Sequence, residues 1–281
     1  MSELRPLLEG REKAEALRYE HGLGAAPIRD LVGLIERIDP DLLTVRRPMP
    51  GGPDAVLLRA RGRRLIAVNT DGRLMRKQRF VTAHVLAHLL FEGADPAVTL
   101  HVDRQVLGGT TAVERRADAF AAHLLVPAAP LRLQLGGRDP LSWTHEELVV
   151  LSLEWGLSMR GLLWHLGHAL VLSDAGRRHL ASLGEPTLEE SLYIGSRAGL
   201  WELVRAGRSA RDTLGWPRRY VALAAAAYDR GQIGEEELRR LLHDEDLAAD
   251  VVELAGMVGR EPGRHRWGEW RPGSDERRGA E

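Results

Sequence analysis

The spacing of apolar residues predicts a mixed first part of the chain. Residues 10–21 and 27–38 have the spacing of amphipathic helices, and residues 41–45 have the character of a strand. Residues 54–60 and 63–69 also read as strands, and the short Arg-Gly segment between them predicts a β-hairpin. The chain therefore begins with helices and then turns to a small sheet.

Helical spacing dominates the rest of the chain. A helix is predicted over residues 73–92, a further strand over 97–102, and a helix over 111–126 that ends before Pro127. Further helices are predicted near residues 145–155, 158–169, 173–183, 188–208, 217–230, 235–244 and 246–258. The order predicts an α+β fold, in which a small mixed sheet is followed by a mostly α-helical C-terminal region.

The segment LGGRDP, residues 135–140, is the best candidate for a domain boundary, because two glycines and a proline interrupt the helical pattern. We expect one domain over residues 1–135 and a helical domain over residues 136–260. Residues 261–281 are rich in glycine, proline, arginine and glutamate and are expected to form a flexible tail.

Composition excludes several classes of protein. The 281 residues carry a net charge of -1, which gives no electrostatic reason to expect nucleic acid or an anionic membrane as a partner. The absence of cysteine excludes disulfides and thiolate metal sites, so any metal must be held by histidine and carboxylate. The charged N-terminus is unlike a signal peptide, and no apolar run has the length of a membrane span. We therefore expect a cytoplasmic protein.

The predicted helix over residues 73–92 contains candidate metal ligands. His84 and His88 are four residues apart, which is the spacing of the histidines in zinc-protease helices. Such helices carry a glutamate directly after the first histidine as the catalytic base, whereas this chain has Val85. Taken alone, the pair is equally consistent with two histidines that bind no metal.

The helix over residues 111–126 adds two carboxylates. Glu114 and Asp118 are four residues apart and therefore share one helical face. A zinc site needs a third ligand beside two imidazoles and a carboxylate that orients one ring, so Glu114 could bind the metal and Asp118 could orient a histidine. The alternative is a solvated helix face next to Arg115 and Arg116.

Two blocks of sequence together resemble the ImmA/IrrE metallopeptidases. They are RFVTAHVLAHLLFEG, residues 79–93, and ERRADAFAAHLLVP, residues 114–127. The strand LIAVN, residues 65–69, is also similar to the strand that precedes the family's active helix. The resemblance covers residues 10–130 and implies a gluzincin-like (zincin-like) fold, in which His84, His88 and Glu114 bind Zn²⁺ and Asp118 holds one histidine.

The chain departs from the family at the catalytic base, because Val85 replaces the glutamate. Valine can neither take up nor donate a proton, so peptidase activity of normal efficiency is not expected. Glu92 and His101 are possible auxiliary groups, although a surface position for Glu92 and a half-exposed strand position for His101 are the favoured interpretations. His123 is expected to be exposed.

These features favour a regulatory protein of the ImmA/IrrE type, either a zinc-binding pseudoprotease or a very weak endopeptidase. The resemblance implies a protein partner such as a transcriptional repressor. One alternative is a protein-interaction module that binds no metal. Another is a DNA-binding regulator that uses residues 147–168, which resemble a helix-turn-helix around Gly156 but offer only Arg160 as a strong contact to DNA.

Overall fold

The computed structural model describes residues 4–60, 63–91, 99–169, 172–209, 215–243 and 245–257. The chain divides into two compact units, Met1–Gly215 and Trp216–Glu281. The expected tail, residues 261–281, lies outside the described residues.

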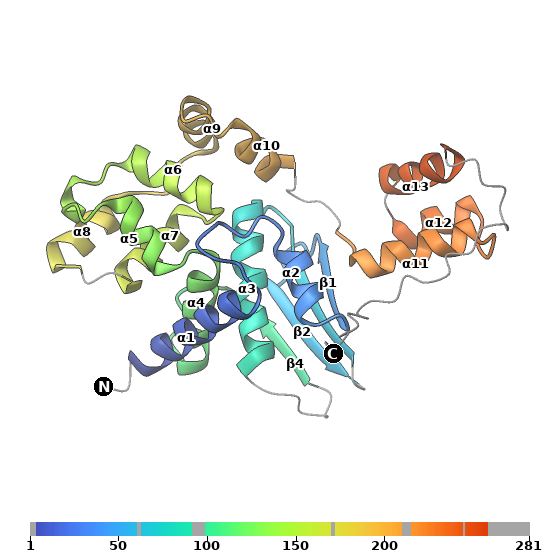
Figure 1. Cartoon of the computed structure of the whole chain (residues 1–281), viewed down its shortest axis with the longest axis horizontal. Helices are drawn as coiled ribbons and strands as arrows, with labels where there is room; N and C mark the ends of the chain where they lie inside the picture. Colours follow the sequence, from blue (N-terminus) through green and yellow to red (C-terminus); the bar gives the residue numbers. More distant parts are fainter. Residues whose placement is uncertain are drawn as a thin grey trace, which may run out of the picture. The chain divides into compact units, whose positions relative to one another are not determined.

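The first unit contains a four-stranded mixed sheet, which lies on the side away from helices α5 to α8, within residues 128–182 (Figure 1). Its strands are β1 (Leu42–Arg47), β2 (Ala55–Ala60), β3 (Arg63–Asn69) and β4 (Thr99–Asp103), arranged in the order β1-β3-β2-β4. The pair β1–β3 is parallel, whereas β2 is antiparallel to both β3 and β4. Alternate residues of β2, among them Ala55 and Leu57, are buried, as a strand with one covered face requires.

Four helices accompany this sheet: α1 (Leu4–Glu20), α2 (Leu31–Ile38), α3 (Met75–Phe91) and α4 (Ala112–Leu125). Helix α3 packs against β2, β3 and α4 and is buried on nearly all sides, because an unbroken series from Phe80 to His88 has little exposed surface (Figure 1). Helices α1 and α4 approach closely at Gly10, where an added Cβ would lie 2.3 Å from the carbonyl oxygen of Arg116. The α+β architecture predicted from the sequence is confirmed.

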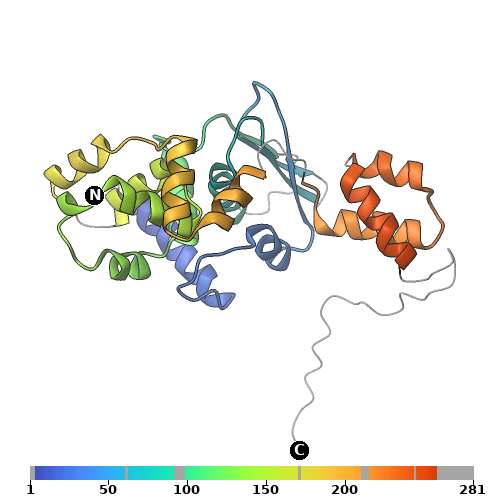
Figure 2. The same cartoon turned by 90° about the horizontal axis from the view of Figure 1, so that it is seen from above.

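The remaining helices of the first unit continue the same core. They are α5 (Ala128–Leu135), α6 (His145–Trp155), α7 (Met159–Ala169), α8 (Asp174–Ser182), α9 (Leu188–Arg197) and α10 (Trp201–Ser209). Helices α5 to α8 lie together at one side of the unit (Figure 1 and Figure 2). Phe120, Leu131, Leu148 and Leu162 belong to one buried cluster, so the core is continuous across residue 135. The expected domain boundary there stays a prediction.

Two details of the helical part differ from the sequence prediction. The single helix expected over residues 188–208 is interrupted, because Gly199 adopts a left-handed conformation with φ of 73° between α9 and α10. Helix α5 was not predicted. Gly156, with φ of 66°, ends α6 as expected and allows the turn into α7.

The second unit contains α11 (Arg218–Asp229), α12 (Glu235–Leu242) and α13 (Glu245–Met257). It has a small core of its own, formed by Ala224, Leu238, Leu242 and Ala248. Across the described part of the chain, every helix is too short or too polar to cross a lipid bilayer.

Candidate metal site

Helix α3 brings His84 and His88 together one helical turn apart. Both side chains are almost completely buried, and their Nε2 atoms lie 3.0 Å from each other. The carbonyl oxygen of His88 accepts a hydrogen bond of 2.8 Å from Nη2 of Arg59 on β2, which ties the helix to the sheet. Two buried imidazole nitrogens therefore face the same point.

Helix α4 brings the carboxylate of Glu114 to that point. Its Oε2 lies 3.2 Å from Nε2 of His84, and its Oε1 lies 3.7 Å from Nε2 of His88. The hydroxyl of Thr111 accepts a hydrogen bond from the Glu114 N–H and begins the helix at this position. Gly109 leaves room for Glu114, because a Cβ there would lie 2.2 Å from the Glu114 Cβ.

Asp118 holds the ring of His84 from the opposite side. Its Oδ1 lies 2.9 Å from Nδ1 of His84, and its Oδ2 accepts a hydrogen bond of 2.9 Å from the Gly108 N–H. When Nδ1 of His84 donates its proton to this carboxylate, the lone pair of Nε2 is directed at the cluster, as in carboxylate–histidine–metal triads. Asp118 thus lies where the sequence predicted an orienting acid.

Asp103, at the end of β4, is a member of the cluster that the sequence reasoning missed. Its Oδ1 lies 3.8 Å from Nε2 of His84 and 3.7 Å from Nε2 of His88. The other carboxylate oxygen, Oδ2, is buried without a hydrogen-bond partner among the described residues. The Asp103 carbonyl oxygen accepts a hydrogen bond of 2.7 Å from the Asp54 N–H, which holds this end of the strand in place.

His101 lies on the same face of β4, two residues before Asp103. Its Nε2 is 2.9 Å from Oδ1 of Asp103, and its ring centroid is 4.0 Å from that of His88. The side chain is partly exposed, and the geometry makes it a partner of Asp103 at the rim of the cluster. The period-two spacing of His101 and Asp103 on a strand is the signal that could have indicated Asp103.

The other residues singled out in the sequence have different outcomes. Glu92 lies outside the described residues. Val85 is completely buried and brings no ionisable group to the cluster. The expectation that His123 is exposed was wrong: its side chain is buried, with its ring centroid 4.6 Å from that of His165 on α7.

The carboxylates make the cluster favourable for positive charge. Burial alone would lower the pKa of His84, but the neighbouring carboxylates of Asp103, Asp118 and Glu114 raise it well above its usual value. Burial opposes ionisation of Asp103, yet the hydrogen bond from His101 and the nearby ring of His84 hold its pKa well below the usual range. A hydrogen bond from His84 likewise lowers the pKa of Glu114. A divalent cation would replace the proton that these groups attract.

The donor set fits a zinc ion. Ligand atoms from His84, His88, Asp103 and Glu114 all lie within 4.8 Å of one another. Ligands about 2.0–2.2 Å from a tetrahedral zinc ion are about 3.3–3.6 Å apart, close to most of the separations found here. The unpartnered Oδ2 of Asp103 shows that the described protein groups do not satisfy this carboxylate by themselves.

A comparison with protein families assigns this part of the chain. Residues 39–158 match a peptidase-family model described as the IrrE N-terminal-like domain, and the match contains the whole cluster. No curated protein matches the chain. Residues 39–158, which hold the candidate metal site, therefore form an IrrE N-terminal-like domain, in agreement with the resemblance to the ImmA/IrrE metallopeptidases.

Proposed function

We propose that this protein is a zinc-binding regulator of the ImmA/IrrE type that acts by binding a protein partner, such as a transcriptional repressor, with little or no endopeptidase activity. The observation that carries the proposal is a cluster of four ligand-type side chains, His84, His88, Asp103 and Glu114, next to an apolar Val85. Side chains that could bind zinc lie together, but position 85, directly after the first histidine, has no proton-transfer group.

Zinc is the metal favoured by this combination of groups. Two imidazoles and two carboxylates are typical zinc donors, and together they balance the charge of a divalent ion. His84 and His88 would bind through Nε2, while Asp118 would keep the His84 ring in the required tautomer. A bound zinc ion would supply Lewis-acid polarisation of a carbonyl group.

Two features argue against efficient peptide hydrolysis. A positioned acid–base group contributes about 10²–10⁴-fold to a reaction rate, and Val85 cannot fill that role. In addition, catalytic zinc sites keep one position open for substrate, whereas structural sites are closed by four protein ligands. Asp103 supplies the fourth donor, so the cluster resembles a closed site.

The free side of β4 supports a protein partner. Within the described sheet β4 is an edge strand, and its outward side chains Leu100 and Val102 are 64% and 42% exposed. Exposed strand edges can pair with an extended segment of another protein, while apolar side chains supply contact area. The edge of β4 adjoins the candidate metal site, because His101 and Asp103 belong to this strand, while Leu100 and Val102 alternate with them and point to the opposite face of the sheet.

The DNA-binding alternative receives less support. Leu162, His165 and Leu166 of α7, the second helix of the helix-turn-helix-like unit, are buried in the core. Arg160 is exposed. Its backbone N–H donates a hydrogen bond of 2.5 Å to Oε1 of Glu185, which places an acidic group beside it. This face therefore offers phosphate groups little positive charge.

Metal analysis of the purified protein without a histidine tag tests the zinc proposal. We expect about one zinc ion per chain, lost in His84→Ala and in Glu114→Ala. His168→Ala is the matched control, because His168 is an exposed histidine outside the cluster. Absence of zinc from the wild-type protein, together with no binding of added zinc, would leave the metal-free interaction module as the explanation.

A further inference from the structure

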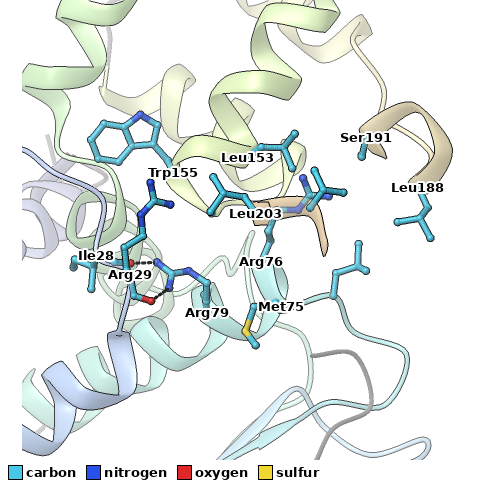
Figure 3. A pocket seen from close by; sticks show the side chains of 13 residues that line it. Ile28, Arg29, Met75, Arg76, Arg79, Leu153, Trp155, Leu188, Ser191 and Leu203 are labelled. Carbon is cyan, nitrogen blue, oxygen red and sulfur yellow. Dashed lines mark hydrogen bonds between the residues drawn. The ribbon is translucent and has the colours of Figure 1, made fainter. Parts of the chain in front are cut away.

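A cavity lies at the N-terminal end of α3, the helix that carries His84 and His88. Its volume is about 270 Å³, and it is bordered by the first turn of α3, the segment before α2, the end of α6, and helices α9 and α10 (Figure 3). Leu153, Trp155 and Leu203 give it largely apolar walls. The candidate metal ligands do not line it, so the cavity is separate from the site described above.

Three arginines, Arg29, Arg76 and Arg79, also line this cavity (Figure 3). The guanidinium of Arg79 is held by the chain itself, because Nη2 donates to the Ile28 carbonyl at 2.5 Å and Nη1 donates to the Arg29 carbonyl at 3.2 Å. Arg29 in turn donates to the Glu154 carbonyl at 3.3 Å. These hydrogen bonds go to uncharged carbonyl acceptors, and Asp30 acts on the Arg79 charge only through space.

Arg76 and Arg79 each have a buried donor without a hydrogen-bond partner among the described residues, Nη1 in Arg76 and Nε in Arg79. Burial lowers the pKa of Arg76, and the carboxylate of Glu185 opposes this change only through space. A buried donor atom that lacks an acceptor is energetically costly, so an acceptor at this position would be favoured.

We propose that this cavity binds a small anionic molecule that has a carboxylate or phosphate group and an apolar body. The anionic group would accept hydrogen bonds from Arg76 beside the positive end of the α3 dipole. The apolar body would contact Leu153, Trp155 and Leu203. The volume is slightly below the range of about 300–1,000 Å³ usual for drug-sized ligands, so the ligand is a small one.

The position of the cavity gives the ligand a regulatory role. Arg76 and Arg79 belong to α3, which also carries His84 and His88, and α10 packs against α3. A ligand at this place would therefore fix the contact between the metal-site helix and α9–α10. The proposal concerns a separate site and does not require that zinc be bound.

Titration of the full chain with inorganic phosphate and with hexanoate tests the proposal. Binding is followed by calorimetry and by the midpoint of thermal unfolding, with sodium chloride at matched ionic strength as the control for general salt effects. We expect saturable binding of at least one probe. Loss of the Arg76 contact in Arg76→Met should weaken binding about tenfold or more. Arg177→Met, which changes an exposed arginine on α8, should bind like the wild type.

A second variant tests binding without a change at Arg76, in case Arg76→Met impairs folding. Leu203→Trp should fill part of the cavity and weaken binding while it leaves all three arginines in place. Without added anion, Arg76→Met should unfold at a temperature no lower than that of the wild type, because it removes a guanidinium whose buried Nη1 has no acceptor. The proposal is overturned if neither probe binds saturably, or if Arg76→Met and Arg177→Met bind equally well.

Discussion

The Oδ1 atom of Asp118 lies 2.9 Å from the Nδ1 atom of His84, and both side chains are buried. The two residues are 34 positions apart, on two neighbouring helices, so packing of α3 against α4 sets this contact. The Gly108 N–H fixes the second oxygen of the same carboxylate. The orientation of a candidate zinc ligand therefore depends on a residue that does not face the metal position.

Asp118→Asn should weaken zinc binding about 10–100-fold, because the amide orients and polarises the imidazole less well than the carboxylate. The measurement is competition for zinc with a chromophoric chelator. Asp250→Asn, which changes an exposed aspartate of the second unit, should bind zinc like the wild type. Equal affinities for Asp118→Asn and wild type would show that the His84 ring needs no support from Asp118.

Asp103→Asn should convert a closed zinc site into an open one. In the cobalt-substituted wild-type protein, four protein ligands leave no free position, so added azide should not change the visible spectrum. In Asp103→Asn the affinity for metal should fall at least about tenfold, and azide should now change the spectrum. An azide response of the wild-type protein as large as that of the variant would exclude Asp103 as a ligand.

The sequence predicted the parts of the site that depend on helical spacing. His84 with His88, and Glu114 with Asp118, are each four residues apart within one helix, so local geometry alone places each pair on one face. Asp103 could not be found in this way, because its approach to the histidines depends on the antiparallel register of β4 with β2. Long-range packing alone determines such a contact.

Burial of isolated polar residues was similarly hard to predict. His123 was expected on a free helix face, but α7 covers that face and places His165 against it.

The α+β class followed from periodicity because most elements are amphipathic. The interruption at Gly199 did not, since a glycine inside a helical pattern can either continue or end the helix.

Val85→Glu should restore measurable peptide cleavage, because it returns a proton acceptor to the position after the first ligand. Combination with Asp103→Asn should raise the rate further, since it frees a position for substrate. Cleavage is measured on a captured protein partner and on an unstructured peptide library, with zinc content determined for each variant. Val81→Glu is the matched control on the same buried helix, and it should destabilise the protein without producing activity. No cleavage by the double variant with zinc bound would count against an enzyme that lost only its base.

Acid should destabilise the protein through the buried pair His123 and His165. Burial lowers the pKa of His165 to about 4 and that of His123 to about 2, so both rings are neutral in the fold. The unfolded chain takes up protons near pH 6.5, and the stabilisation by a neutral ring is therefore lost as pH falls from about 6.5 toward 4. For His165 alone the loss is about 2 kcal/mol at pH 5 relative to pH 8. The free energy of unfolding, measured with urea at several pH values, should fall less in His165→Gln than in the wild type as the pH is lowered. The same pH dependence in both proteins would contradict the prediction.

Gly10→Ala should destabilise the first unit by about 1–3 kcal/mol through overpacking between α1 and α4. The added methyl would lie 2.3 Å from the Arg116 carbonyl oxygen and 2.8 Å from the Phe120 nitrogen, and backbone atoms cannot move away as a side chain can. Gly167→Ala is the matched control, because a Cβ on this residue of α7 meets nothing within 4 Å. In a helix that change should stabilise by up to about 1 kcal/mol.

Since α4 carries Glu114 and Asp118, separation of α1 from α4 should also weaken zinc binding in Gly10→Ala. A destabilised Gly10→Ala protein with unaltered zinc affinity would show that α4 keeps its place against α3 without support from α1.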